Sequence, residues 1–168
     1  MYSSTEQNDV RWMNLALAEA EEARGKDEVP VGAVIVLDGR VIGRGHNQVE
    51  TLNDPTAHAE IIAIGAAGSF LGSWRLEDAT MYVTLEPCAM CAGAIVLARL
   101  KRLVFGARDP KAGACGSVME VIGNASLNHK VGVESGVLQD EAALLLKEFF
   151  GRKRRDARAV ESGGLENR

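Results

Sequence analysis

The first part of the chain repeats apolar residues every three to four positions among polar ones, which is typical of an amphipathic helix. Apolar residues recur at helical spacing between Val10 and Ala20, and Gly25 follows the pattern. Asn8 and Asp9, just ahead of it, are residue types that cap helices. We therefore predict a helix that starts near residue 9, ends at Gly25 and packs one face against a sheet.

A β-branched apolar run follows at residues 31–37. Asp38-Gly39 separates this run from Val41-Ile42, and a two-residue Asp-Gly connection is a strong hairpin signal. The pattern predicts that the first two strands are antiparallel neighbours.

The rest of the chain alternates predicted strands with predicted helices. We expect strands at 79–85, 103–105 and 131–133, and helices from 57 after an N-cap at Thr56, from 88 to about 98, and from 140 to 155. Residues 109–130 are rich in Gly, Asn and Ser and are expected to form a long loop with one short helix at 118–122. This alternation predicts an α/β fold of three layers, α/β/α, with helices around a mixed five-stranded sheet.

Composition indicates one globular domain. The 168 residues are 46% hydrophobic and 25% charged, which suits a buried core and excludes a disordered chain. The longest uncharged run, 61–74, is shorter than the roughly 20 residues that a membrane-spanning helix needs. The polar N-terminus carries no secretory signal, so we expect a cytoplasmic protein with one domain over 1–159 and a disordered tail over 160–168.

Charge is distributed unevenly along the chain. The net charge is −4, but residues 152–158 carry +4, which leaves −8 on the remainder. Such a basic segment is a candidate nucleic-acid contact, and a solvated basic helix face would give the same pattern.

Two short motifs carry the candidate chemistry: His58-Ala59-Glu60, and Pro87-Cys88-Ala89-Met90-Cys91 after the next predicted strand. Residues three apart share one helix face, so Cys88 and Cys91 can bind one metal ion, with His58 as a third ligand. This ligand set suits zinc. Three protein ligands leave one position for water, as in catalytic zinc sites, and Glu60 can then serve as the general base and acid beside it.

Spacing alone leaves other interpretations of the cysteines open. Cys88 and Cys91 could form a redox pair, or belong to a closed zinc site whose fourth ligand is Cys115, His46 or His129. None of those three residues lies in a second paired motif, and a redox pair would leave the His-x-Glu motif unexplained. A closed site would indicate a noncatalytic RNA-binding module.

Further segments strengthen one family resemblance. They are Pro30-Val-Gly-Ala-Val34, Asp54-Pro-Thr-Ala-His-Ala-Glu60, Tyr82-Val-Thr-Leu-Glu-Pro-Cys88, Cys91-Ala-Gly-Ala94, Val104-Phe-Gly-Ala-Arg-Asp109 and Asn128-His129. His-x-Glu with Pro-Cys-x-x-Cys is the signature of zinc-dependent nucleobase deaminases, and over roughly residues 8 to 155 the chain resembles the bacterial tRNA-specific adenosine deaminases among them. The resemblance implies a cytidine deaminase-like fold and hydrolysis of the wobble adenosine (position 34) of tRNA to inosine.

The resemblance also assigns roles to residues. It implies a homodimer with one zinc ion per subunit on His58, Cys88 and Cys91, zinc-bound hydroxide attacking C6 of adenine, Glu60 as proton shuttle, and Asn47 reading the flipped-out base. The other implied substrate contacts are Val29, Val31, Ala59, Leu85, Asp109, Phe150, Arg152 and Arg154. The tRNA anticodon stem-loop would lie on the basic C-terminal helix. An enzyme of this fold acting on a free base or small nucleotide, such as guanine or cytosine, is the alternative, but a free base has no phosphate for the basic segment to bind.

Overall fold

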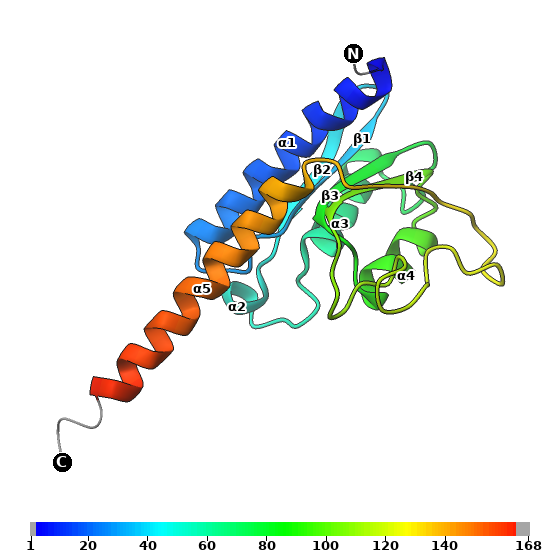
Figure 1. Cartoon of the computed structure of the whole chain (residues 1–168). Coiled ribbons are helices and arrows are strands. Elements are labelled where there is room, and N and C mark those ends of the chain that lie inside the picture. The colour runs from blue at the N-terminus through cyan, green and yellow to red at the C-terminus, as the bar shows by residue number, and fades with distance from the viewer. Residues whose placement is uncertain (1–2, 164–168) are drawn as a thin grey trace.

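A mixed five-stranded sheet forms the centre of the computed structural model, which describes residues 3–163 (Figure 1). Its strands are β1 (Gly32–Leu37), β2 (Arg40–His46), β3 (Thr80–Leu85), β4 (Arg102–Ala107) and β5 (Gly132–Ser135), in the order β2-β1-β3-β4-β5. β1 is antiparallel to both β2 and β3, whereas β3, β4 and β5 are parallel. The predicted hairpin and the predicted mixed sheet are confirmed.

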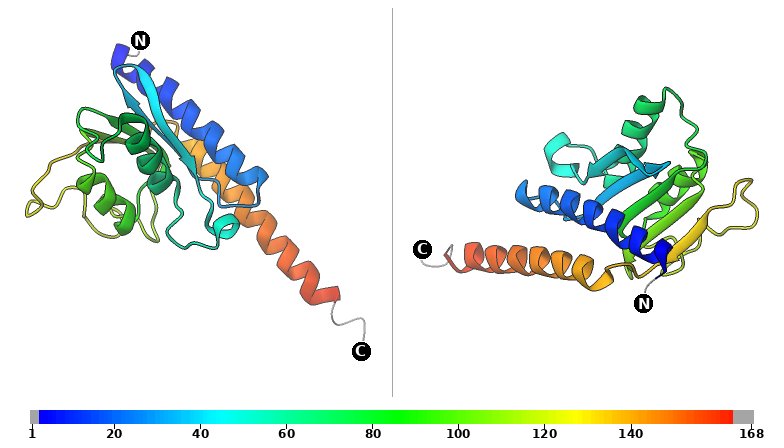
Figure 2. Two further views of the ribbon diagram at one scale, coloured as in Figure 1. Left: turned by 180° about the vertical axis from the view of Figure 1, so that it is seen from behind. Right: turned by 90° about the horizontal axis from the view of Figure 1, so that it is seen from above.

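Helices cover both faces of the sheet (Figure 2). They are α1 (Ser4–Gly25), α2 (Val49–Leu52), α3 (Ala59–Leu71), α4 (Ala89–Leu97) and α5 (Gln139–Gly163). α1 and α5 lie on one face, and α3 and α4 lie on the other (Figure 2). The three-layer α/β/α prediction is therefore confirmed.

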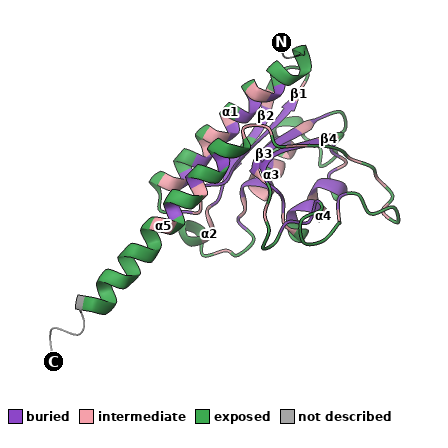
Figure 3. Cartoon of the chain, viewed as in Figure 1, coloured by how far each residue is buried: buried purple, intermediate pink, exposed green. Residues whose placement is uncertain are grey.

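The central strands are buried on both faces (Figure 3). In β1, Val34 packs with Trp12 and Met13 of α1, whereas Ala33 and Ile35 belong to the core beneath α3 and α4. Burial on both faces explains why these strands read as continuous apolar runs and not as alternating ones.

The start of α1 differs from the prediction. Ser3 is the N-cap: its hydroxyl accepts the Glu6 N–H (3.2 Å), and the Glu6 carboxylate accepts the Ser3 N–H (2.7 Å), which is a capping box. Asp9 is instead buried inside the helix, where it binds Arg102 through two hydrogen bonds of 2.7 Å and accepts the Tyr82 hydroxyl at 2.9 Å. The prediction of an N-cap at Asn8 or Asp9 was wrong because the Ser3 capping box already starts the helix at Ser4. The Asp9 carboxylate is used in a long-range ion pair with Arg102.

Other element boundaries also differ from the predictions. Thr56 does not cap α3, because its N–H and hydroxyl donate to Asp54 Oδ1, and His58 is the N-cap. Residues 118–122 contain bends, an isolated β-bridge at Glu120 and the start of a turn in place of the expected helix, and α2 lies in a segment for which no helix was predicted. α5 continues past residue 155 to Gly163, so residues 160–163 are helical; residues 164–168 of the expected tail lie outside the described residues.

None of the helices within residues 3–163 combines the length and the apolarity that crossing a membrane requires.

Close packing of α3 on β2 gives the first testable expectation. A Cβ added to Gly43 would lie 2.5 Å from the Ala63 carbonyl oxygen, whereas one on Gly65, on the exposed side of α3, would have no atom within 4 Å. We expect Gly43→Ala to lower the free energy of unfolding by about 2 to 3 kcal/mol through overpacking, and Gly65→Ala to raise it by up to about 1 kcal/mol. Urea titration of both variants measures this, and equal stability of the two would contradict the packing described.

Candidate active site

The topology brings the ends of four strands together on one side of the molecule, and this row of strand ends is called the edge below. β2, β3 and β4 run in the same direction and β1 runs against them. Their carboxyl ends therefore meet the amino end of β1, and this edge carries Val31, Asn47, Leu85 and Asp109. Open α/β sheets bind ligands at such an edge.

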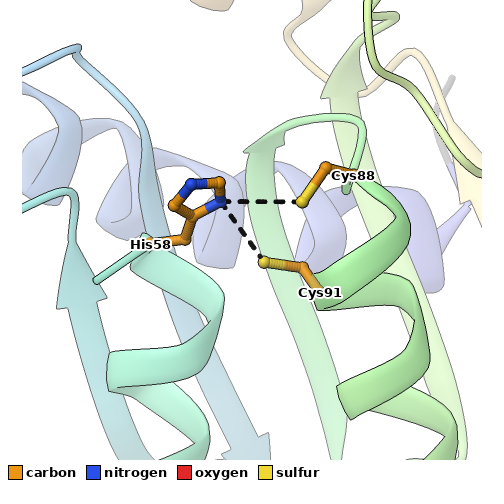
Figure 4. Close-up of side chains that lie close together, drawn as sticks. All are labelled: His58, Cys88 and Cys91. Atoms are coloured by element: carbon orange, nitrogen blue, oxygen red, sulfur yellow. Dashed lines mark hydrogen bonds between the residues drawn. The ribbon is translucent and has the colours of Figure 1, made fainter. Parts of the chain in front are cut away.

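The amino ends of α3 and α4 lie side by side at this edge (Figure 4). His58 is the N-cap of α3, Cys88 is the N-cap of α4, and Cys91 lies in the first turn of α4. His58 Nδ1 lies 3.6 Å from Cys88 Sγ and 3.5 Å from Cys91 Sγ, and the three ligand atoms lie within 4.8 Å of one another. The sequence predicted these residues at the amino ends of two helices, and the structure brings these two ends together.

These distances fit a zinc ion. With Zn–S bonds of about 2.3 Å, a Zn–N bond of about 2.1 Å and tetrahedral angles, sulfur and nitrogen ligands would lie about 3.6 Å apart. The observed separations of 3.5 and 3.6 Å match this value. The helix amino ends also favour thiolates, because the helix dipole stabilises negative charge there.

His58 Nδ1 is within hydrogen-bond distance of both cysteine sulfur atoms, and these contacts shift the pKa values of all three groups. Hydrogen bonds from Cys91 and His58 lower the pKa of the Cys88 thiol to about 3, and the hydrogen bond with Cys88 raises the pKa of His58. The hydrogen bond with Cys88 and burial raise the pKa of Cys91. A bound cation would displace the protons on these ligands, which is how metal binding is coupled to proton release.

Of the three side chains considered as alternative fourth ligands, the two histidines have other partners and Cys115 lies outside the group of candidate ligands. His46 binds Glu19 (Nδ1 to Oε2, 3.0 Å) and Lys26 (Nε2 to Nζ, 3.0 Å), and His129 Nε2 contacts the Leu100 carbonyl oxygen at 2.7 Å. Within residues 3–163, the group of candidate ligands contains His58, Cys88 and Cys91 and no fourth His, Cys, Asp or Glu. The described residues thus offer three ligands, as an open catalytic site requires.

Glu60 is buried beside this group. It occupies the first turn of α3 and is 4% exposed. Burial raises its pKa, and a raised pKa brings a carboxyl group toward the range in which it can both accept and donate a proton. The structure therefore places a buried carboxyl group next to the candidate metal ligands.

A pocket of about 390 Å³ opens above these residues. Six of the expected substrate contacts line it, namely Val29, Val31, Asn47, Leu85, Asp109 and Phe150. Ala59 is fully buried beneath it, and its N–H donates to Asn47 Oδ1 at 2.9 Å. This bond fixes the Asn47 side chain with its Nδ2 amino group left to donate. It also engages the backbone N–H of Ala59, one of the expected substrate contacts.

The cations of α5 divide into two groups. Arg152 binds Asp27 Oδ1 at 2.8 Å, and Lys153 binds Asp27 Oδ2. Arg154, Arg155 and Arg158 are exposed and make no ion pair with the described residues. Arg152 and Arg154 were both expected to contact the substrate. Arg152 instead binds the connection between α1 and β1, and Arg154 remains available to a ligand.

Several pocket residues were missed by sequence reasoning. They are Glu86, Arg108, Pro110, Lys111, Ala112 and Leu146. Leu146 lies four residues before Phe150, so helical spacing could have identified it. Arg108 and residues 110–112 had no such signal, because they lie in a connection without regular structure.

A family model for MafB19-like deaminases matches residues 7–154. A tRNA-specific adenosine deaminase of Agrobacterium fabrum is 52% identical over 147 residues, which cover 88% of this chain and 97% of that protein. The tRNA-specific adenosine deaminase of Bacillus subtilis is 48% identical over 152 residues, covering 90% and 94%.

A solved structure from a study of A-to-I editing by tRNA:A34 deaminases at the wobble position of transfer RNA has a similar fold over most of this chain. Its TM-score is 0.78, with 51% identity over 81% of this chain and 99% of that one.

Proposed function

Since the chain belongs to the MafB19-like deaminase family and, within it, to the tRNA-specific adenosine deaminases, we propose that it hydrolyses the wobble adenosine (position 34) of a tRNA anticodon to inosine. The observation that carries the proposal is the pocket in which buried Glu60 lies beside three candidate metal ligands. A tRNA substrate would make this a cytoplasmic enzyme.

One zinc ion per chain would be held by His58, Cys88 and Cys91, whose distances fit it. When bound, zinc supplies a Lewis acid that lowers the pKa of water to about 7. The remaining chemistry falls to the side chains of the pocket.

Glu60 would move the protons. It would take one proton from the attacking water and deliver it to N1 of adenine. It would then move the remaining proton of the oxygen bound to C6 to the amino group, which leaves C6 as ammonia. The overall reaction consumes one water and releases one ammonia. The buried position of Glu60 at the pocket floor supports this assignment.

The pocket would hold the flipped-out base. Its volume of about 390 Å³ suits a ligand of nucleoside size, and Val29, Val31 and Leu85 supply apolar walls. Asn47, fixed through its oxygen by Ala59, would donate from Nδ2 to an acceptor atom of the base.

The rim of the pocket would contact the flanking RNA. Asp109 and Phe150 lie on this rim, where a carboxylate can bind a ribose 2′-hydroxyl and an aromatic ring can stack on an unpaired base. The C-terminal half of α5 projects beyond the rest of the molecule and is exposed (Figures 1 and 3). Its cations would bind phosphates of the anticodon stem-loop.

A homodimer is also part of the proposal. Met90 and Leu97 lie seven residues apart on one face of α4 and are exposed. Exposed apolar side chains on one helix face favour contact with another protein surface.

The unpaired cations of α5 provide a test of RNA binding. We expect Arg154→Ala with Arg158→Ala to weaken binding of an anticodon stem-loop about tenfold and to reduce the slope of log K against log salt by about 2, because about one counterion is released per phosphate contact. The value of kcat should change little. Fluorescence anisotropy at several salt concentrations measures this. The matched control is Arg11→Ala, an exposed arginine of α1 that lies over the Trp12 ring, and equal losses in both variants would argue against specific contacts on α5.

The activity itself is tested with tRNA that carries adenosine at position 34. Wild-type protein should convert it to inosine, detected by nuclease digestion and mass spectrometry. The same tRNA with guanosine at position 34 is the control. Turnover of free guanine or cytosine without any inosine in tRNA would favour the small-substrate alternative.

A further inference from the structure

Glu86 is a buried carboxylate for which the proposed mechanism has no role. It follows Leu85 at the end of β3, and its side chain is 0% exposed. Oε1 accepts hydrogen bonds from Ser117 Oγ (2.7 Å) and Arg108 Nη1 (3.3 Å), whereas Oε2 has no donor among residues 3–163. Burying a carboxylate costs free energy even when it is paired. A buried carboxylate at this position therefore points to a local role.

The following loop lies directly on the Glu86 carboxylate. A Cβ on Gly113 would lie 1.5 Å from Glu86 Oε2, so the chain can pass this close only at a glycine. The Gly113 N–H donates to the Asp109 carbonyl (3.0 Å), and the Ala114 N–H donates to the Pro87 carbonyl (2.8 Å). The loop is thus bound to the segment that leads to Cys88.

This loop forms one wall of the substrate pocket. Residues 109–112 line the pocket, and they belong to the stretch between β4 and β5 that has no helix or strand. Arg108 lies just before this wall and Ser117 lies after it, and both donate to the same oxygen of Glu86. One carboxylate oxygen therefore binds the chain on both sides of the wall.

We propose that Glu86 is a positioning residue that orders the pocket wall 109–112 by binding Arg108 on one side of it and Ser117 on the other. This assignment rests on the proposed function, because it assumes that the wall, including Asp109, contacts the RNA substrate. A wall that is ordered in the free protein lowers the entropy lost when substrate binds. Loss of the Glu86 contacts therefore raises KM, while kcat, which depends on residues of α3 and α4, changes little.

The test uses zinc-loaded protein carrying Glu86→Gln, which removes the charge at constant size, or Ser117→Ala, which removes one donor. Ser73→Ala is the matched control, because Ser73 Oγ accepts the Arg75 N–H in a turn at the far end of α3. Hydrogen exchange of amides 111–114 should accelerate about tenfold in Glu86→Gln and severalfold in Ser117→Ala, with no change in Ser73→Ala. KM for the anticodon stem-loop should rise by about the same factors. Ser117→Thr, which keeps the hydroxyl, should restore both.

The outcomes are separable. Unchanged exchange at amides 111–114 in both variants overturns the proposal, and so does faster exchange with an unchanged KM, because Glu86 would then have no effect on substrate binding. If Glu86→Gln fails to fold, Ser117→Ala and its threonine rescue decide alone. If wild-type protein forms no inosine, the proposed function fails, whereas hydrogen exchange still decides whether Glu86 orders the wall.

Discussion

Replacing Glu60 with glutamine should lower kcat for inosine formation by about 10³- to 10⁴-fold, the upper part of the range for a lost general acid–base group. Glutamine keeps the size of the side chain but can neither accept nor deliver the proton that must pass from water to adenine. The change should leave the fold intact, because Glu60 lies at the amino end of α3, where an amide is tolerated. Single-turnover assays with saturating tRNA measure the chemical step directly.

Two measurements make the Glu60 result specific. Zinc content should remain at one ion per chain, since Glu60 is not among the three candidate ligands. Glu77→Gln is the matched control, because Glu77 is an exposed carboxylate that pairs only with neighbouring Arg75 among the described residues, and it should retain wild-type kcat. A Glu60→Gln protein with wild-type kcat would eliminate the proposed proton transfer.

Removing a candidate metal ligand should abolish both zinc binding and activity. We expect Cys91→Ser to lower zinc affinity by about 10³-fold or more. In a site with three protein ligands, each ligand contributes a large share of the zinc binding free energy. Inosine formation should fall to background in the same protein. Elemental analysis after dialysis against a weak chelator gives the zinc content, and the tRNA assay gives the activity.

Cys115 is the matched control for Cys91. Both thiols are buried, but Cys115 lies outside the group of candidate ligands, and burial raises its pKa to about 12, so it stays a thiol at neutral pH. Cys115→Ala should keep one zinc ion per chain and wild-type activity. Full zinc content in Cys91→Ser, or zinc loss in Cys115→Ala, would refute the ligand assignment.

The family resemblance and the fold class, both inferred from sequence, are confirmed by the comparisons and the structure. The Asp38-Gly39 hairpin and the helix tips that carry His58 and Cys88 were predictable, because they depend on turn chemistry and on residues only a few positions away. Local patterns of this kind involve one element or two consecutive elements.

The pocket was only partly predictable. Asn47, Leu85 and Asp109 lie on different strand ends, and only the resemblance suggested that they act together. Their convergence depends on the strand order β2-β1-β3-β4 and on the direction of each strand. Sheet order is set by packing across the whole chain, which no short window of sequence contains.

The sequence by itself determined the chemistry available to this protein: a histidine, two cysteines and a glutamate at two helix starts, and a basic C-terminal helix. Only the tertiary structure decided how other charges are used. Asp9 binds Arg102, Asp27 binds Arg152, and Glu86 holds the loop from Arg108 to Ser117. A charged side chain can meet any opposite charge that folding brings near it, so its partner is fixed by the packing of distant elements and not by its neighbours in the chain.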